Sequence, residues 1–361
     1  MRVDSERYVR DILDMQNFPG IRRRRRRIAT RTYVLLGMVG LLGVPACSLE
    51  GGGTEAVGAS GAARTVTVGF LYDVHAANIW TLSECESPDL KVELRNFKQF
   101  AEVQRAFEGG QIDAAAMGYQ NLAQMIGNGY DDFRVVSGVY TGGEHITVKA
   151  GSGISDWKDL VGKKVGIPPN SFVEMLFRSS MKEAGVKIED VEIVPFPGAG
   201  PPMLAALERG DIDAMVAWES NSASAAVQGI GEYPPFDIQE GEIGKATSAL
   251  YVTEKLASDA PDTVDALVKC VQERTDALSN DVDTWVEALT SRTGLEAPVA
   301  RQAVKTGEMD VRLYQDSAER IIKEFAENGL LKDVSNQVVT KFDYGPLERV
   351  TGKTKSELGA K

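Results

Sequence analysis

An internal repeat constrains the fold of this 361-residue chain more than any other feature. Residues 106–114 read AFEGGQIDA and residues 206–214 read ALERGDIDA, an offset of 100 residues. Upstream, VELRNF at 92–97 is matched by VEIVPF at 191–196, and VTVGF at 66–70 is matched by KVGIP at 164–168. Short apolar or alternating runs are typical of strands, and glycines after helical runs are typical helix ends. Each half is therefore predicted to run strand, helix, strand, helix, strand.

Strands that alternate with helices favour an α/β fold with two lobes, each a mostly parallel sheet with helices on both faces. Helices are predicted at 261–278, 283–293, 298–306 and 314–328 from their periodicity and cap residues. The run ATSALYVT at 246–253 predicts a strand that crosses back into the first lobe. The expected layout is lobe 1 at 64–145 and 246–345 with the C-terminal helices, lobe 2 at 146–245, and a charged tail at 346–361, disordered beyond Thr351.

The N-terminus has the pattern of an export signal, expected at residues 1–46. Six arginines at 22–27 precede the apolar run 33–44, which is too short to span a bilayer. The run ends in VPAC and resembles a bacterial lipobox, which implies a lipid on Cys47 and anchoring at the outer face of the cell membrane. Residues 47–63 are Gly-rich and are expected to form a flexible tether. Export by the general or the twin-arginine route, a start at Met1 or Met15, and a buried helix with a chance cysteine all remain open.

The charge distribution separates the leader from the body. Residues 1–46 hold ten arginines and four acidic residues, about +6, so the net charge of −12 leaves about −18 on the remainder (−12 − 6). Phosphate backbones bind basic surfaces, so this acidic body argues against a nucleic-acid partner.

The remaining cysteines, Cys85 and Cys270, suit a disulfide outside the cytoplasm, or two separate buried thiols. The chain has two histidines and neither a CxxC nor an HExxH motif, so no zinc ligand set is visible. No metal or other cofactor is expected.

Further stretches resemble a known family. Together with the paired ExGxIDA elements, SDWKDLVGKKVGIPPNS at 155–171 and WES at 218–220 resemble the type 2 periplasmic binding proteins of the nitrate, sulfonate, taurine and thiamine-precursor group. The resemblance covers about residues 64 to 330. It implies two lobes joined by crossover strands, a small-molecule ligand held in the cleft, and delivery by a monomer to the permease and ATPase of an ABC importer.

Ligands of open α/β sheets sit beyond the carboxyl ends of the strands, which selects the loops of the predicted cleft. The candidate ligand-binding residues on these loops are Tyr72, His75, Trp80, Tyr119, Gln120, Glu144, Ser171, Phe172, Gly198, Trp218 and Glu219. No arginine lies in these loops, so we expect a ligand with a flat or apolar part stacked on a ring. Its polar end, an amine or heterocycle N–H, would meet Glu219, Glu144 or His75. Sulfonates and pyrimidines remain possible, while nitrate is disfavoured.

Several of these residues also have purely structural interpretations. Ser171 and Glu174 form a capping-box pattern, and capping alone is the favoured role for Ser171. Asp113 and Asp213 recur in the repeat, and a turn or cap role is favoured for both. Trp218 is as consistent with a core position as with a cleft wall.

Two other functional classes compete with transport. The chain has no GxSxG elbow, no P-loop and no cysteine cluster, so no enzymatic activity is expected. A ligand-sensing subunit of a membrane receptor would have the same fold and differ only in its partner, so sensing remains an alternative to import.

Overall fold

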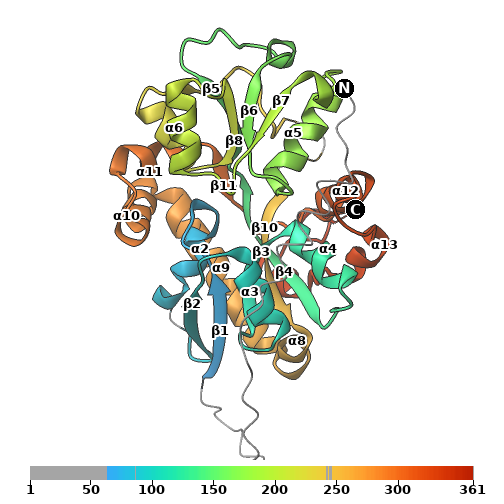
Figure 1. The fold of residues 1–361 in the computed structure, drawn as a ribbon. Coiled ribbons are helices and arrows are strands. Elements are labelled where there is room, and N and C mark those ends of the chain that lie inside the picture. Colours follow the sequence, from blue (N-terminus) through green and yellow to red (C-terminus); the bar gives the residue numbers. More distant parts are fainter. Residues whose placement is uncertain (1–62, 86, 241–242, 244–245, 361) are drawn as a thin grey trace, which may run out of the picture. The chain divides into compact units, whose positions relative to one another are not determined.

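Two mixed β-sheets organise the chain in the computed structural model, which describes residues 63–85, 87–240, 243 and 246–360 (Figure 1). The predicted export signal, Cys47 and almost all of the predicted tether lie outside these residues. Within the described part, no helix combines the length and the apolarity needed to cross a membrane.

Sheet A has the strand order β11-β4-β10-β3-β1-β2 and sheet B the order β7-β6-β8-β5-β9. The strands of sheet A are β1 (Arg64–Phe70), β2 (Leu90–Asn96), β3 (Ala114–Gly118), β4 (Phe133–Gly142), β10 (Ala246–Thr253) and β11 (Gly307–Met309). The strands of sheet B are β5 (Glu144–Lys149), β6 (Lys164–Ile167), β7 (Glu192–Pro195), β8 (Ala214–Trp218) and β9 (Gly231–Glu232). The predicted two-sheet α/β fold is confirmed.

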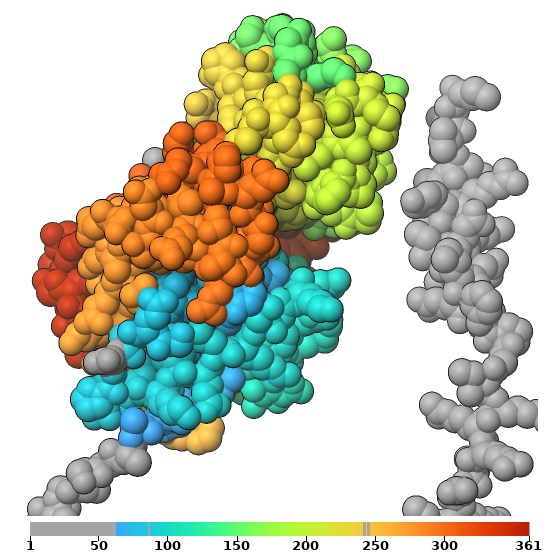
Figure 2. Space-filling view, turned by 90° about the vertical axis from the view of Figure 1, so that its left-hand side faces the viewer, coloured from blue at the N-terminus to red at the C-terminus, as the bar shows by residue number. Residues whose placement is uncertain are grey.

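Helices cover both sheets. They are α2 (Ala77–Trp80), α3 (Phe100–Glu108), α4 (Tyr119–Gly127), α5 (Phe172–Glu183), α6 (Pro201–Arg209), α7 (Asn221–Val227), α8 (Glu254–Asp259), α9 (Pro261–Asn280), α10 (Val282–Thr293), α11 (Ala297–Ala303), α12 (Gln315–Glu327), α13 (Ser335–Val338) and α14 (Gly345–Thr351). The four predicted C-terminal helices correspond to α9, α10, α11 and α12. Helix α11 contacts α7, and Figure 2 shows the orange surface around residue 300 meeting the yellow surface around residue 225.

The sequence repeat is also a structural repeat. Strands β2-β1-β3 are parallel and in the same order as β7-β6-β8. The strands that pass between the sheets are different: β10 runs antiparallel to β3 and β4, and β5 runs antiparallel to β8. The sheets are therefore mixed, and the expectation of mostly parallel sheets holds only for the repeated cores. The physical reason is that a strand returning directly from the other sheet enters without a helical crossover.

The aspartates of the repeat join neighbouring strands, a structural role that differs from the predicted local turn or cap. The Asp113 carboxylate accepts a hydrogen bond from Thr67 N at 2.9 Å, and Asp113 N donates to Thr67 O at 2.9 Å. The Asp213 carboxylate accepts from Lys164 N at 2.9 Å, and Asp213 N donates to Lys164 O at 2.8 Å. Each aspartate thus extends the pairing of two parallel strands by one residue, which explains why the repeat carries IDA before β3 and β8.

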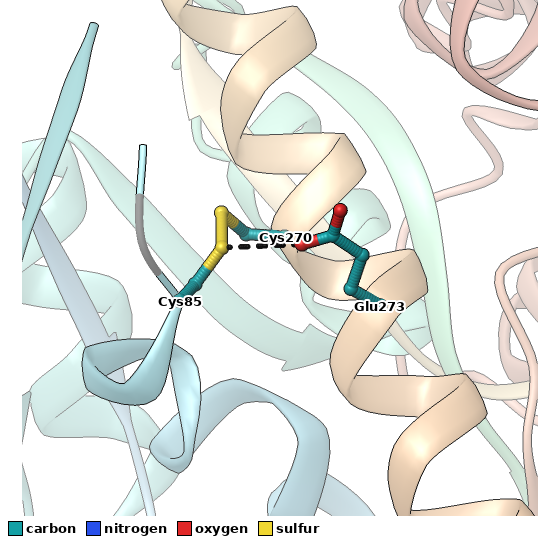
Figure 3. A group of neighbouring side chains, drawn as sticks. All are labelled: Cys85, Cys270 and Glu273. Carbon is teal, nitrogen blue, oxygen red and sulfur yellow. Dashed lines mark hydrogen bonds between the residues drawn. A yellow bond between two sulfur atoms is a disulfide. The ribbon is translucent and has the colours of Figure 1, made fainter. Parts of the chain in front are cut away.

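Sheet A is built from two distant parts of the chain. Strand β10, predicted at these same residues, lies between β3 and β4. Cys270 of α9 forms a disulfide with Cys85, with 5.7 Å between the Cα atoms, so the structure selects the bridge over two separate thiols (Figure 3). The Glu273 carboxylate lies 3.6 Å from Cys85 Sγ. A disulfide offers no thiolate to a metal ion, so this group of three side chains stabilises sheet A and its covering helix.

The C-terminal segment corrects the prediction of a disordered tail. Leu358 is buried, Leu313 N donates to Leu358 O at 3.0 Å, and Gln315 N donates to Gly359 O at 3.3 Å. One apolar side chain, Leu358, lies among the charged residues of this segment. Its burial, with the two backbone hydrogen bonds, holds the segment against the residues that precede α12.

Replacing Asp213 with Ala should lower the free energy of unfolding by about 1–2 kcal/mol, because the backbone N–H of Lys164 loses a charged acceptor. Urea denaturation followed by circular dichroism measures the change. Asp211→Ala is the matched control, since Asp211 forms only an exposed ion pair with Arg209 and should change stability by less than about 0.5 kcal/mol. Equal effects of the two substitutions would contradict this role for the repeat.

Candidate functional site

The two sheets are joined at a glycine pair. Strand β4 ends at Gly142 and β5 begins at Glu144, and Gly142 and Gly143 have φ angles of 79° and 87°. These left-handed conformations favour glycine, and a Cβ at Gly143 would lie 2.5 Å from Nε2 of His75. The second crossover, β10, brings Thr247 to the same place, where its hydroxyl donates to Gly142 O at 2.9 Å and can donate to Glu144 Oε2 at 3.2 Å.

A row of ionisable side chains extends from this junction. Glu144 pairs in register with Trp218, so Glu219 comes directly beside it, and the two glutamates are 1% and 3% exposed. His145 Nε2 lies 3.1 Å from Glu219 Oε2, and His145 Nδ1 contacts the carboxylate of Asp237. The hydroxyl of Tyr233 donates to Glu219 Oε1 at 2.8 Å. One imidazole therefore lies between two carboxylates.

Burial changes the protonation of this row. Desolvation raises the pKa of Glu144 well above its ordinary value and also raises the pKa of Glu219, although the charge of His145 opposes the latter. Burial alone would lower the pKa of His145, but the hydrogen bond and charge of Asp237, with the charge of Glu219, outweigh it and raise that pKa. The junction therefore retains protons to higher pH than free side chains would.

The loop after β1 adds a second pair of groups. Burial raises the pKa of Asp73 to about 7, although backbone N–H groups of His75 and Ala76 oppose the shift. Burial lowers the pKa of His75 to about 4. The neutral imidazole lies 3.4 Å from Gly143 O through Nε2, which acts as the donor. His75 thus touches the glycine pair as a neutral side chain and adds no positive charge at neutral pH.

Several buried polar atoms near the junction have no hydrogen-bond partner within the described residues. They are Glu144 Oε1, the hydroxyl of Tyr140, Asp73 Oδ1 and Trp285 Nε1. The Tyr140 ring lies 5.0 Å from the His75 ring and 6.3 Å from the Trp285 ring, between centroids. Buried polar groups are nearly always paired, so these donors and acceptors have unused hydrogen-bonding capacity.

A cavity of about 150 Å³ adjoins this group and contains space for a few water molecules or a small polar group. Its lining residues are Thr141, Gly142, Gln239, Lys305, Thr306, Gly307 and Glu308. Gln239 connects the cavity to the junction, because its amide donates to Glu144 O at 2.5 Å. Lys305 and Glu308 are both exposed, so the cavity has one charge of each sign at its outer side.

The structure brings together Glu144, Glu219 and His75 from the predicted site. Trp218 is half-buried beside Glu219, and Tyr72 is exposed. Gln120 and Gly198 are half-buried on other strand ends. Ser171 caps α5 by accepting from Glu174 N at 3.2 Å, which confirms its predicted structural role, while ligand contact by these residues stays a prediction.

The structure departs from expectation at three predicted aromatic contacts. Trp80, Tyr119 and Phe172 are 0%, 1% and 4% exposed and belong to the hydrophobic core. The loop after β1 coils into α2, which packs on α9 and buries Trp80. The Tyr119 hydroxyl donates to Leu313 O at 2.6 Å, and Phe172 begins α5. Position at a strand end was not enough to expose these rings.

Sequence reasoning missed Tyr140, Tyr233, Asp237, Gln239, Thr247 and Trp285 as members of this site. Asp237 and Gln239 lie in the connection between β9 and β10, which has no periodic pattern. The predicted crossover strand was the one signal available. A strand that returns to the first sheet brings the residues before it close to the place where the two sheets join.

Comparison with known proteins gives the family. The family model described as NMT1-like matches residues 60–289. The chain belongs to the NMT1-like family. The taurine-binding periplasmic protein of Escherichia coli (strain K12) is 27% identical to this NMT1-like protein over 198 residues, which are 54% of this chain and 60% of the relative. The match thus spans less than two thirds of that relative's length.

Solved structures share the fold of this NMT1-like protein. The aliphatic sulphonate binding protein of Escherichia coli has a TM-score of 0.66 at 20% identity, covering 76% of this chain and 91% of its own. The nitrate-binding protein of Synechocystis PCC 6803 has a TM-score of 0.66 at 13% identity, covering 82% and 91%. The desulfurization enzyme DSZB has a TM-score of 0.60 at 16% identity, covering 80% and 99%. At these identities the likeness concerns the fold alone.

Replacing Glu144 with Gln should make this NMT1-like protein more stable relative to wild type at pH 8 than at pH 5. The folded chain keeps the Glu144 proton above the ordinary pKa of 4.5, so rising pH lowers the stability of wild type, whereas Gln does not titrate. The difference in unfolding free energy should grow by on the order of 1 kcal/mol or more. Denaturant titrations at both pH values measure it.

Glu208→Gln is the control for that experiment, because Glu208 is exposed on α6 and its substitution should give the same difference at both pH values. A difference for Glu144→Gln that does not change with pH would show that Glu144 ionises normally in the folded protein.

Proposed function

We propose that this protein is the extracytoplasmic solute-binding component of an ABC importer, anchored to the cell membrane by lipid on Cys47 and acting as a monomer. The observation that carries the proposal is the burial of Glu144 and Glu219 at the junction of two α/β sheets joined by crossover strands. Taurine-, sulphonate- and nitrate-binding relatives of the same fold support it.

Capture of ligand would proceed by closure of the two lobes about the junction. The proposed lobes are 64–145 with 246–345 and 146–245, and the proposed hinge lies at the crossover strands, at Gly142-Gly143 and at β10. Two consecutive glycines at positive φ can change conformation at lower cost than other residues. Burial of the glutamates then corresponds to the closed arrangement, and opening would expose them to incoming solute.

The ligand we propose is a small organic molecule: a sulfonate, a pyrimidine-like compound or another aromatic or heterocyclic compound. Trp218 and Tyr72, which keep exposed ring surface, would pack against its flat part. The buried carboxylates make a bare inorganic anion the least suitable occupant.

Binding without turnover is part of the same proposal. Both cysteines in the described part of the chain are joined in a disulfide, so neither presents a thiolate nucleophile. Sensing through a membrane receptor differs from import only in the partner protein. Co-purification of the membrane-extracted protein with a permease and its ATPase would support import.

A thermal-shift screen against taurine, alkanesulfonates, pyrimidines, aromatic amines and nitrate should identify a ligand, because a compound at a hundredfold excess over its Kd stabilises the fold by about 2.7 kcal/mol. Calorimetric titration of that ligand should show a loss of about 1–3 kcal/mol of binding free energy for Trp218→Ala, since the ring surface against the ligand is lost. Trp218→Phe keeps an aromatic ring and should retain most of the affinity.

Recovery of chemically altered ligand would overturn the binding-protein proposal, and unchanged affinity of Trp218→Ala would overturn the role of this ring.

Replacing Cys47 with Ala should abolish lipid attachment, because the thiol that would carry the diacylglycerol is gone. Mass spectrometry of the N-terminal peptide from the membrane fraction is expected to show a lipidated Cys47 in wild type and a soluble, unmodified variant. An unmodified Cys47 at the N-terminus of the exported wild-type protein would contradict anchoring at this position.

A further inference from the structure

The sheet junction holds more carboxyl groups than basic side chains. Asp73, Glu144, Glu219 and Asp237 place four carboxyl groups there, and within the described chain none of them forms an ion pair with arginine or lysine. Among the described residues, His145 forms ion pairs with Glu219 and Asp237, while His75 is neutral at physiological pH. An anion entering this space would oppose ionisation of these buried carboxyl groups, whereas a cation would favour it, in surroundings of low dielectric constant.

Unpaired atoms independently indicate what the junction accepts. Glu144 Oε1 and Asp73 Oδ1 are buried acceptors without a donor in the described residues, although Glu144 Oε2 accepts from Thr247. The hydroxyl of Tyr140, completely buried and equally unpaired, is subject to the charges of Glu219 and Glu144 and so lies among them. N–H donors satisfy carboxylate oxygens that lack a partner, and donors that carry positive charge form the stronger bonds.

We infer that the ligand of this site carries a protonated nitrogen, as an ammonium, an amidinium or a protonated heterocycle, whose N–H groups donate to Glu144 Oε1 and Asp73 Oδ1. The inference rests on the proposed function, because it assumes that the junction is the ligand site. It narrows the ligand from small organic molecules in general to organic cations and separates this chain's ligand from sulfonates and nitrate that lack such a nitrogen.

Cation binding at this site has a proton signature. The groups that face Glu144 are Thr247 on β10, Glu219 after β8, Asp237 before β10 and Tyr140 on β4, with His145 next in sequence. Burial raises the pKa of Glu144, so the ligand-free site retains this proton to higher pH than a free glutamate does. A bound cation would stabilise the carboxylate and release that proton, whereas an anion would favour uptake of a proton.

The test uses two matched sets of probes, each with one carbon frame and three charges. The first set is 2-phenylethylamine, 2-phenylethanol and 2-phenylethanesulfonate, and the second is pentylamine, pentanol and pentanesulfonate. Titration calorimetry at pH 7 in phosphate gives the affinities, and a pH indicator in weakly buffered solution without amines measures the protons released or taken up. We expect the amine of at least one set to bind at least tenfold more tightly than its alcohol and sulfonate, with net release of protons.

Variants assign that effect to the junction. Glu144→Gln should lower the affinity for the amine tenfold or more and remove most of the proton release. Glu208→Gln, an exposed carboxyl on α6, should leave both unchanged. Lys245 precedes β10 and lies outside the described residues, so Lys245→Ala tests whether the chain itself supplies the positive charge. Amine binding by Lys245→Ala alone, and not by wild type, would overturn the inference.

Three other results would also overturn the inference. A sulfonate could bind more tightly than its amine, Glu144→Gln could leave the affinity for the amine unchanged, or neither amine could bind. The proposed function survives any of these results if a sulfonate, a pyrimidine or another solute binds and is recovered unchanged. It fails separately if the broad screen finds no solute at all.

Discussion

The burial of Glu144 beside the glycine hinge is the constraint on which the site depends. A carboxyl group in that position is costly unless it is protonated or paired, and among the described residues the Thr247 hydroxyl is the one side-chain donor to Glu144. The side chains that surround it come from β4, β8, β10 and the connection before β10, so they meet only when both crossovers are in place. The connectivity of the two sheets therefore determines which side chains form the site.

The repeat shows how such a junction can be supported by simple means. In both halves an aspartate accepts from and donates to the backbone of the neighbouring parallel strand, which fixes the start of β3 and β8. Fixing these strands also positions the residues just beyond their carboxyl ends, including Glu219 after β8. The repeated residues thus act on the framework, while the residues that differ between the halves supply the chemistry.

The likeness to binding proteins and to a desulfurization enzyme of the same fold illustrates this separation of framework and site. Folds with TM-scores of 0.60 to 0.66 to this chain belong to proteins whose names indicate sulphonate binding, nitrate binding and desulfurization. In this chain the junction holds four carboxyl groups and a histidine whose pKa is raised by Asp237 and Glu219 against the effect of its burial. Ligand selection therefore depends on side chains that fold similarity leaves undetermined.

Sequence alone determined the repeat, the two-sheet class, the position of β10, the C-terminal helices and the capping role of Ser171. These features arise from local periodicity, capping and strand pairing, which a short window of residues contains. Tertiary structure decided the rest. The pairing of Cys85 with Cys270, the burial of Trp80, Tyr119, Phe172 and Leu358, and the meeting of Tyr140, Asp237 and Gln239 with Glu144 each join segments far apart in the chain. Such contacts depend on how the crossover strands bring the two sheets together, and a local sequence pattern contains no information on that arrangement.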